Sequence, residues 1–195
     1  RHIENIKKFG VPVVVAINDF ITDTQNEHNA IIKFCENLKV SCKISSHWSD
    51  GGKGAESLAK RVVEIIESET SNFKPLYDDN MSLWEKTKSI AQNIYGAENI
   101  IADKKVRNKF DKFEKDGFGS YPICMAKTQY SFSTDPLLMG APSGHEVPIR
   151  EIRLCSGAEF IVVICGEIMT MPGLPRIPAS DNIKLNKNGE IEGLF

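Results

Sequence analysis

The sequence predicts an α/β fold that begins with a parallel sheet and ends in a smaller α+β part. Two apolar, β-branched runs, "VPVVVAIN" (11–18) and "VSCKISS" (40–46), flank a helical pattern at 24–38, which is the rhythm of a βαβ unit. Residues 73–120 are charged and helical in pattern, whereas residues 121–195 are rich in strand patterns. A chain of 195 residues can form one large domain or two small ones.

The first part, residues 1–72, is expected to form a βαβα unit. Its first strand is continuously apolar, which is typical of a parallel strand buried on both faces. Asp23 or Thr24 can cap the helix at 24–38, and a second helix follows at 55–68. Both helices carry apolar residues at helical spacing that should pack against the sheet: Ala30, Ile31, Phe34 and Leu38 on the first, Leu58, Val62, Ile65 and Ile66 on the second.

The remaining elements follow from similar patterns. A helix over 1–9 ends at Gly10, and the middle part contains helices in "SLWEKTKSIAQNIYG" and "KKVRNKFDKFEKDGFG", each ending at glycines. Three strands are predicted in the last part, at 121–127, 146–154 and 160–168. The tail is a hairpin whose turn is Asn188–Gly189. Because the chain opens at Arg1 inside a helical pattern, we expect it to begin within a longer protein.

Composition excludes several classes of function. The net charge of -2 leaves no basic excess for nucleic acid. Five cysteines without CxxC spacing argue against a disulfide framework or a zinc site, and the four histidines show no ligand spacing, so no metal site is predicted. No apolar stretch reaches the roughly 18–20 residues that span a bilayer, so we expect no membrane partner and a cytoplasmic location.

A glycine cluster, "HWSDGGKGAE" (47–56), stands where a phosphate loop would be expected. The Walker pattern requires Gly-Lys-Ser/Thr, because the hydroxyl binds magnesium, but Gly54 follows Gly52–Lys53 here. The spacing therefore favours a tight turn from a strand into a helix over a triphosphate site.

Two aromatic residues follow the predicted parallel strands. The first strand ends at Asn18 and is followed by Phe20, and Trp48 follows the second strand. The motif that reads guanine in GTPases, Asn-Lys-x-Asp, fails here, because residues 18–21 are Asn-Asp-Phe-Ile. Ligands bind at the carboxyl ends of parallel strands, so the two rings could sandwich a planar group, although ordinary core or rim aromatics remain an alternative.

Two further segments are dense in polar residues. The segment "AKTQYSFSTDP" (126–136) follows a strand, and "GEIMTMPGLP" (166–175) leaves another one. Turn chemistry explains such residues as well as a ligand site does. The candidate cleft residues in the two segments are Lys127, Thr128, Gln129, Tyr130, Glu167 and Thr170.

These segments in order resemble the C-terminal part of formate–tetrahydrofolate ligase. The resemblance includes "VPVVVAINDFITDT", "HWSDGGKGAESLA", "YPICMAKTQYSFSTDP" and "REIRLCSGAEFIVVICGEIMTMPGLPRIPA", and it extends over nearly the whole chain. It implies a portion of a multidomain enzyme, namely the end of a sheet core related to P-loop NTPases followed by an α+β part.

The resemblance also implies an activity and site residues. The family joins formate to tetrahydrofolate with MgATP through formyl phosphate, with no tightly bound cofactor and with a monovalent cation possible in the intact enzyme. Phe20 and Trp48 match the aromatics that sandwich the pterin, while Asn18, Ala141 and Ser143 are nucleotide-side candidates. The implied partners are the three substrates, the missing N-terminal portion and further copies of the intact enzyme.

The family's phosphate loop has no counterpart in this sequence, so this portion alone is expected to be inactive and no catalytic residue is assigned. Two alternatives stay open. One is a separate nucleotide-binding switch domain built on the βαβ start. The other is a non-catalytic, ligase-derived interaction module.

Overall fold

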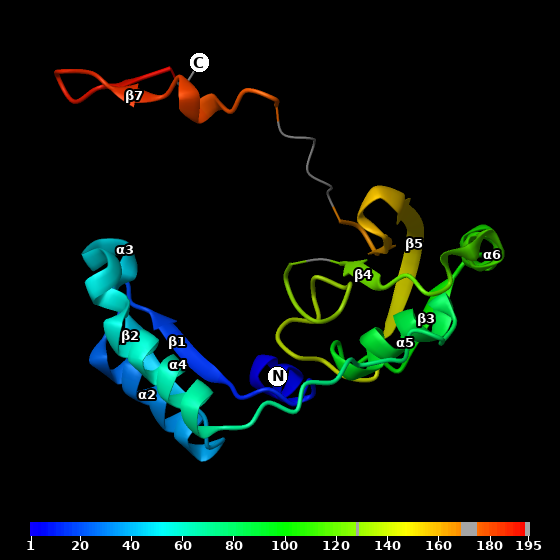
Figure 1. The fold of residues 1–195 in the computed structure, drawn as a ribbon, viewed down its shortest axis with the longest axis horizontal. Coiled ribbons are helices and arrows are strands. Elements are labelled where there is room, and N and C mark those ends of the chain that lie inside the picture. The colour runs from blue at the N-terminus through cyan, green and yellow to red at the C-terminus, as the bar shows by residue number, and fades with distance from the viewer. Residues whose placement is uncertain (128, 169–174, 194–195) are drawn as a thin grey trace.

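A computed structural model of the chain describes residues 1–127, 129–168 and 175–193. Figure 1 shows two α/β units joined by an extended stretch, with a hairpin at the C-terminal end. The first unit contains a two-stranded sheet, and the second contains a mixed four-stranded sheet. The predicted α/β class with parallel strands is therefore confirmed.

The first unit is the predicted βαβα arrangement. Strand β1 (Val14–Asn18) pairs in parallel with β2 (Ser41–Ser45), and Asn18 lies opposite Ser45 in the register. Helix α2 (Gln25–Asn37) begins at a capping box, in which the Thr24 hydroxyl accepts from the Glu27 amide and the Glu27 carboxylate accepts from the Thr24 amide. Helices α2 and α4 (Glu56–Ser68) pack against β2.

The predicted buried faces of this unit are largely wrong. Strand β1 is only partly buried, with Ile17 as its one buried residue. On α2 the buried residues are His28 and Cys35, whereas Ile31 and Phe34 are exposed. The physical reason is that a sheet of two described strands offers too little surface to cover both helices.

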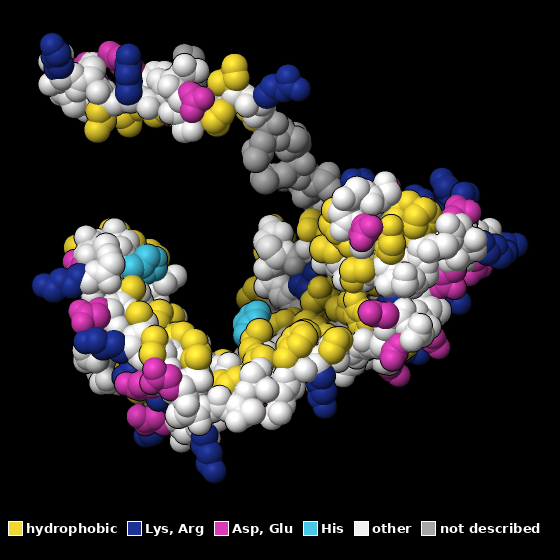
Figure 2. All heavy atoms as spheres, viewed as in Figure 1, with side chains coloured by type: hydrophobic (Ala, Val, Ile, Leu, Met, Phe, Trp, Pro, Cys, Tyr) yellow, Lys and Arg dark blue, Asp and Glu magenta, His cyan; other side chains and the backbone are white. Residues whose placement is uncertain are grey.

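The same holds for α4. Ile65 is buried there, as predicted, but Val62 and Ile66 are exposed. Figure 2 shows hydrophobic side chains on the surface in this region of the first unit.

The second unit is built on a mixed sheet with the strand order β3-β5-β6-β4. The three predicted strands are confirmed as β4 (Ile123–Ala126), β5 (Glu146–Cys155) and β6 (Phe160–Cys165). Strand β3 (Asn99–Ala102) was not predicted, because its four residues lie inside a charged, helical region. It pairs in parallel with β5, while β5 and β6 are antiparallel and β4 is parallel to β6.

Helices α5 (Leu83–Asn93) and α6 (Lys104–Phe113) pack against this sheet, and α6 continues into the wide turn Glu114–Phe118. One apolar core joins these helices to the strands, and it includes Leu83, Phe110 and Ile161. The core therefore extends across residue 120, where the sequence pattern suggested a change from a helical to a strand-rich part.

The two ends of the chain form short elements. Helix α1 (His2–Lys7) lies against the second unit, where the Asn5 side-chain amide donates to the backbone oxygen of Ile94 at 2.9 Å. The predicted tail hairpin is confirmed by β7 (Lys184–Leu185) and β8 (Ile191–Glu192). Gly189 adopts a φ of 80°, but the connection is longer than the two-residue turn predicted, because the Asn186 carboxamide oxygen accepts from the amides of Asn188 and Glu190.

A lysine lies inside the second unit. Lys86 on α5 has no exposed surface, and its ammonium group donates to the backbone oxygens of Gly119 at 2.8 Å and Tyr121 at 3.3 Å. Desolvation lowers the pKa of Lys86, against the opposing effect of nearby carboxylates such as Asp79. The lysine thus fixes the turn that leads from α6 to β4.

We expect Lys86→Met to lower the free energy of unfolding by about 1–3 kcal/mol, because the partly buried carbonyls of Gly119 and Tyr121 lose their donor. Because the folded pKa is lowered, the unfolded state binds more protons as the pH approaches about 10.5, and the wild type should gain stability relative to the variant there. Denaturant unfolding at several pH values measures both effects. The exposed lysine in Lys105→Met is the control, and equal stability of the two variants would contradict the role of Lys86.

Candidate functional site

An aromatic pair lies at one edge of the first sheet. Phe20 follows β1 after one residue, and Trp48 lies in the short helix α3 (His47–Asp50) that follows β2. Because β1 and β2 are parallel, their carboxyl ends meet at this edge. The ring centroids are 6.1 Å apart with an interplanar angle of 26°, and each residue is 56% exposed. The structure therefore brings Phe20 and Trp48 together, as predicted from the sequence.

Both aromatic residues are positioned through the backbone. The Trp48 indole N–H donates to the backbone oxygen of Asp19. The Phe20 amide donates to the Asp23 carboxylate at 2.9 Å, and the Asp23 amide donates to the Phe20 carbonyl at 2.9 Å. These bonds fix one edge of the indole and the backbone of Phe20, while each residue stays 56% exposed.

The spacing of the rings bears on what they can hold. A planar group between two rings needs about 7 Å, which is twice the optimal carbon–carbon separation of about 3.5 Å. The two rings stack on each other with their centroids 6.1 Å apart, so they must move apart to admit a third ring between them. Rotation of the exposed Phe20 side chain can supply that displacement while the Trp48 indole keeps its hydrogen bond to Asp19.

The glycine cluster forms a turn beside Trp48, as the sequence indicated. Residues Gly51–Ala55 make a short helical turn into α4, and the Ser46 amide donates to the Gly54 oxygen at 3.2 Å. A Cβ atom on Gly54 would lie 2.6 Å from the Ser46 carbonyl carbon, whereas one on Gly52 would meet nothing within 4 Å. Gly54 is thus required by the close approach of two backbone segments.

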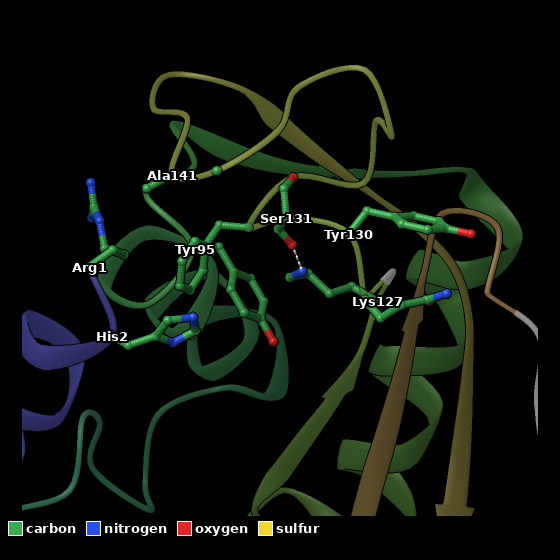
Figure 3. A pocket seen from close by; sticks show the side chains of 10 residues that line it. Arg1, His2, Tyr95, Lys127, Tyr130, Ser131 and Ala141 are labelled. Carbon is green, nitrogen blue, oxygen red and sulfur yellow. Dashed lines mark hydrogen bonds between the residues drawn. The ribbon is translucent and has the colours of Figure 1, made fainter. Parts of the chain in front are cut away.

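A separate cavity of about 580 Å³ lies in the second unit, beside the loop that connects β4 to β5 (Figure 3). Of the predicted site residues, Lys127, Gln129, Tyr130 and Ala141 line it. The loop closes on itself, because the Phe132 amide donates to the Gly140 oxygen.

Lys127 is the cationic group of the β4–β5 loop that faces this cavity. Its ammonium group donates to the backbone oxygen of Ser131 and lies 5.2 Å from the Tyr95 ring and 5.9 Å from the Phe132 ring. Burial lowers the pKa of Lys127, and the nearby Cys165 opposes this shift. Burial also raises the pKa of Tyr95 to about 12, so Tyr95 stays a neutral donor at physiological pH. A cation framed by aromatic rings is suited to an anionic or planar ligand.

The other predicted residues are not gathered at this cavity. Asn18 is exposed at the end of β1 in the first unit, and Ser143 is exposed outside the cavity lining. Glu167 is exposed just after β6. Thr128 and Thr170 lie outside the described residues.

Sequence reasoning missed several residues that the fold brings to these places. Tyr95, Phe132 and His2 line the cavity from three segments, and no local pattern connects them. His28 of α2 lies beside Asp19 and Asp23, although the histidines show no ligand spacing among themselves. The signal available in the sequence was the pair of carboxylates that flanks Phe20, with a histidine in the first turns of the following helix.

Parallel strands that present side chains for ligands at their carboxyl ends are typical of an α/β enzyme domain. A family model described as formate–tetrahydrofolate ligase matches residues 1–195. The chain belongs to the formate–tetrahydrofolate ligase family.

Similar proteins named formate–tetrahydrofolate ligase support this assignment. The chain is 58% identical over its whole length to those of Pelagibacter ubique and Ruegeria pomeroyi, and 55% identical to that of Granulibacter bethesdensis. The match covers 35%, 35% and 34% of these proteins, so the chain spans about a third of the length of the curated relatives it matches. Within the described residues, no helix is both long and apolar enough to cross a membrane.

Substitution of Gly54 tests the turn that carries Trp48. We expect Gly54→Ala to cost about 1–3 kcal/mol of stability, because the added methyl group overlaps the Ser46 backbone. The matched control is Gly52→Ala, which should stay within about 0.5 kcal/mol of the wild type. Thermal or denaturant unfolding compares the two, and equal losses would show that the approach of Gly54 to Ser46 is not a constraint.

Proposed function

We propose that the protein containing this chain is an ATP-dependent ligase that joins formate to tetrahydrofolate, and that this chain is its C-terminal portion. The observation that carries the proposal is the aromatic pair, Phe20 and Trp48, in a chain that matches the ligase family over its whole length. Relatives at 55–58% identity carry the name of this activity. Once the two rings separate, the pair offers two flat faces to the pterin ring of the folate.

The reaction that we propose has two steps. A formate oxygen attacks the γ-phosphorus of ATP, which forms formyl phosphate and releases ADP. The N10 amine of tetrahydrofolate then attacks the formyl carbon, and phosphate leaves as the amine loses its proton. Formyl phosphate hydrolyses in water, so stacked aromatic rings that exclude water from the folate side would protect it. The phosphate-binding and magnesium-binding groups belong to another part of the protein.

Exposed apolar surface supports the proposal that another part of the protein covers this portion. Ile31 and Phe34 on α2, and Val63 and Ile66 on α4, are between 42% and 72% exposed. A sheet of two strands is marginal without further strands or helices against it. We propose that the N-terminal portion continues this sheet and covers the apolar faces of both helices, with residues 1–72 as the folate-side part of a P-loop-related core.

We propose the cavity beside Lys127 as part of the nucleotide side. Ala141 lines it, and Lys127 supplies a cation within a frame of aromatic rings. A purine could stack on an aromatic face there while the ammonium group meets an anionic oxygen. Asn18 and Ser143 join this proposal only if the intact protein brings them to the cavity.

We expect Trp48→Ala to weaken tetrahydrofolate binding by about 1–3 kcal/mol, because one of two stacking faces is lost. The control is Phe73→Ala. Phe73 is 64% exposed and stacks on Phe9 with ring centroids 6.2 Å apart, away from the sheet edge that carries Phe20 and Trp48. Equilibrium titration of tetrahydrofolate with the full-length protein measures both variants. An unchanged dissociation constant for Trp48→Ala would show that the pterin does not bind at this edge.

Substitution of Lys127 tests the nucleotide side. Lys127→Met should weaken ATP binding to the full-length protein by roughly 10- to 150-fold, because a hydrogen bond to a charged group contributes about 1.5–3 kcal/mol. Lys109→Met is the control, since Lys109 also donates to a backbone oxygen and faces a phenylalanine ring, but outside the cavity. If both variants bound ATP like the wild type, the cavity would have no role in nucleotide binding.

A further inference from the structure

Three potential metal ligands from one short segment, residues 19–28, meet at the aromatic edge of the first sheet. Asp19 follows β1, Asp23 ends the turn before α2, and His28 lies on α2 itself. One ligand atom from each residue lies within 4.8 Å of the others. Two carboxylates and an imidazole form a mixed oxygen and nitrogen donor set.

The histidine is what distinguishes this cluster from an ordinary acidic patch. The His28 side chain is only 9% exposed, and its Nε2 atom has no hydrogen-bond partner. A buried imidazole nitrogen without a hydrogen bond has lost the bond that it would make to water. It lies between the two carboxylates, 3.2 Å from Asp19 Oδ1 and 3.8 Å from Asp23 Oδ2, without the geometry of a hydrogen bond to either.

These separations suit a shared ion. In a tetrahedral site with bonds of about 2.1 Å, neighbouring ligand atoms lie about 3.4 Å apart. The two separations from Nε2 bracket that value. Asp19 and Asp23 are 35% and 29% exposed at their side chains, so an ion can enter from solvent and keep a water molecule as a further ligand.

We propose that Asp19, Asp23 and His28 bind one divalent transition-metal ion of the Zn²⁺ type. The imidazole selects against Mg²⁺ and Ca²⁺, which prefer oxygen ligands throughout. The ion would fix the aromatic pair, because Asp23 accepts the Phe20 amide and the Asp19 carbonyl accepts the Trp48 indole N–H. This proposal does not depend on which molecule the rings bind.

Cobalt is a suitable probe, because Co²⁺ takes zinc sites and has visible d–d bands that report its coordination. The full-length protein is stripped with a chelator, and Co²⁺ is added in the presence of excess Mg²⁺, which occupies oxygen-only sites. We expect one equivalent of Co²⁺ with the bands of four or five nitrogen and oxygen ligands. Added Zn²⁺ should displace it.

Variants locate the ion. His28→Gln and Asp19→Asn should each weaken Co²⁺ binding by at least the roughly 10- to 100-fold that loss of an outer-shell partner costs. His47→Gln is the matched control, because His47 is an exposed histidine on the same edge, outside the cluster. Asp19→Asn is nearly isosteric, so it keeps the test valid if His28→Gln fails to fold.

Two outcomes would overturn the proposal. One is the absence of stoichiometric Co²⁺ binding by the wild type. The other is binding that Asp19→Asn leaves unchanged, or that shows sulfur charge-transfer bands, which would place the ion at cysteines such as Cys35 and Cys42.

Discussion

The parallel pairing of β1 and β2 is the constraint on which the first unit depends. The register places Asn18 opposite Ser45, so the residues that follow the two strands leave the sheet at one edge. Phe20 and Trp48 are 28 positions apart in the sequence, so it is the fold that brings them together. A shift of the register by one residue would turn one side chain to the opposite face. The aromatic pair, the turn at Gly54 and the carboxylates of Asp19 and Asp23 all follow from this pairing.

The cavity of the second unit depends on a loop that is held by its own polar groups. The hydroxyl of the buried Ser133 donates to the Asp135 carbonyl at 2.8 Å and accepts from the Asp135 amide at 3.0 Å. The loop is also tied to its surroundings, because the Gly144 amide donates to the Gly96 oxygen at 3.0 Å. These bonds hold the loop between Lys127 and Gly144, which forms one side of the cavity.

The sequence predicted the positions of the helices and strands better than it predicted which of their faces are buried. Periodicity located α2, α4, β4, β5 and β6, because apolar spacing and capping residues are local signals. It failed for Ile31 and Phe34, since burial depends on what packs against a helix and the described sheet has only two strands beside it. Strand β3 was not predicted, because its four residues lie inside a charged region with a helical pattern.

The candidate site was predictable where strand ends define it and not where distant segments meet. Phe20 and Trp48 follow from the rule that parallel strands share an edge. Tyr95 and Phe132 come from a helix end and a loop, and only the fold brings them to Lys127. His28 is different, because it is only nine positions from Asp19 and its approach to the two carboxylates follows from the turn that leads into α2.

The contact between Phe20 and Trp48 is consistent with a site for a planar ligand, because the energies favour insertion. Separating the two rings loses one aromatic contact, which contributes about 0.5–1.5 kcal/mol beyond burial. A planar ring between them gains two stacking contacts, each of about 1–3 kcal/mol. The displacement that insertion requires can occur in the Phe20 side chain, because the hydrogen bonds that position Phe20 are made by its backbone, whereas the Trp48 indole itself donates to the Asp19 oxygen. The rings therefore cover each other when no ligand lies between them, and a flat ligand replaces a weaker contact with two stronger ones.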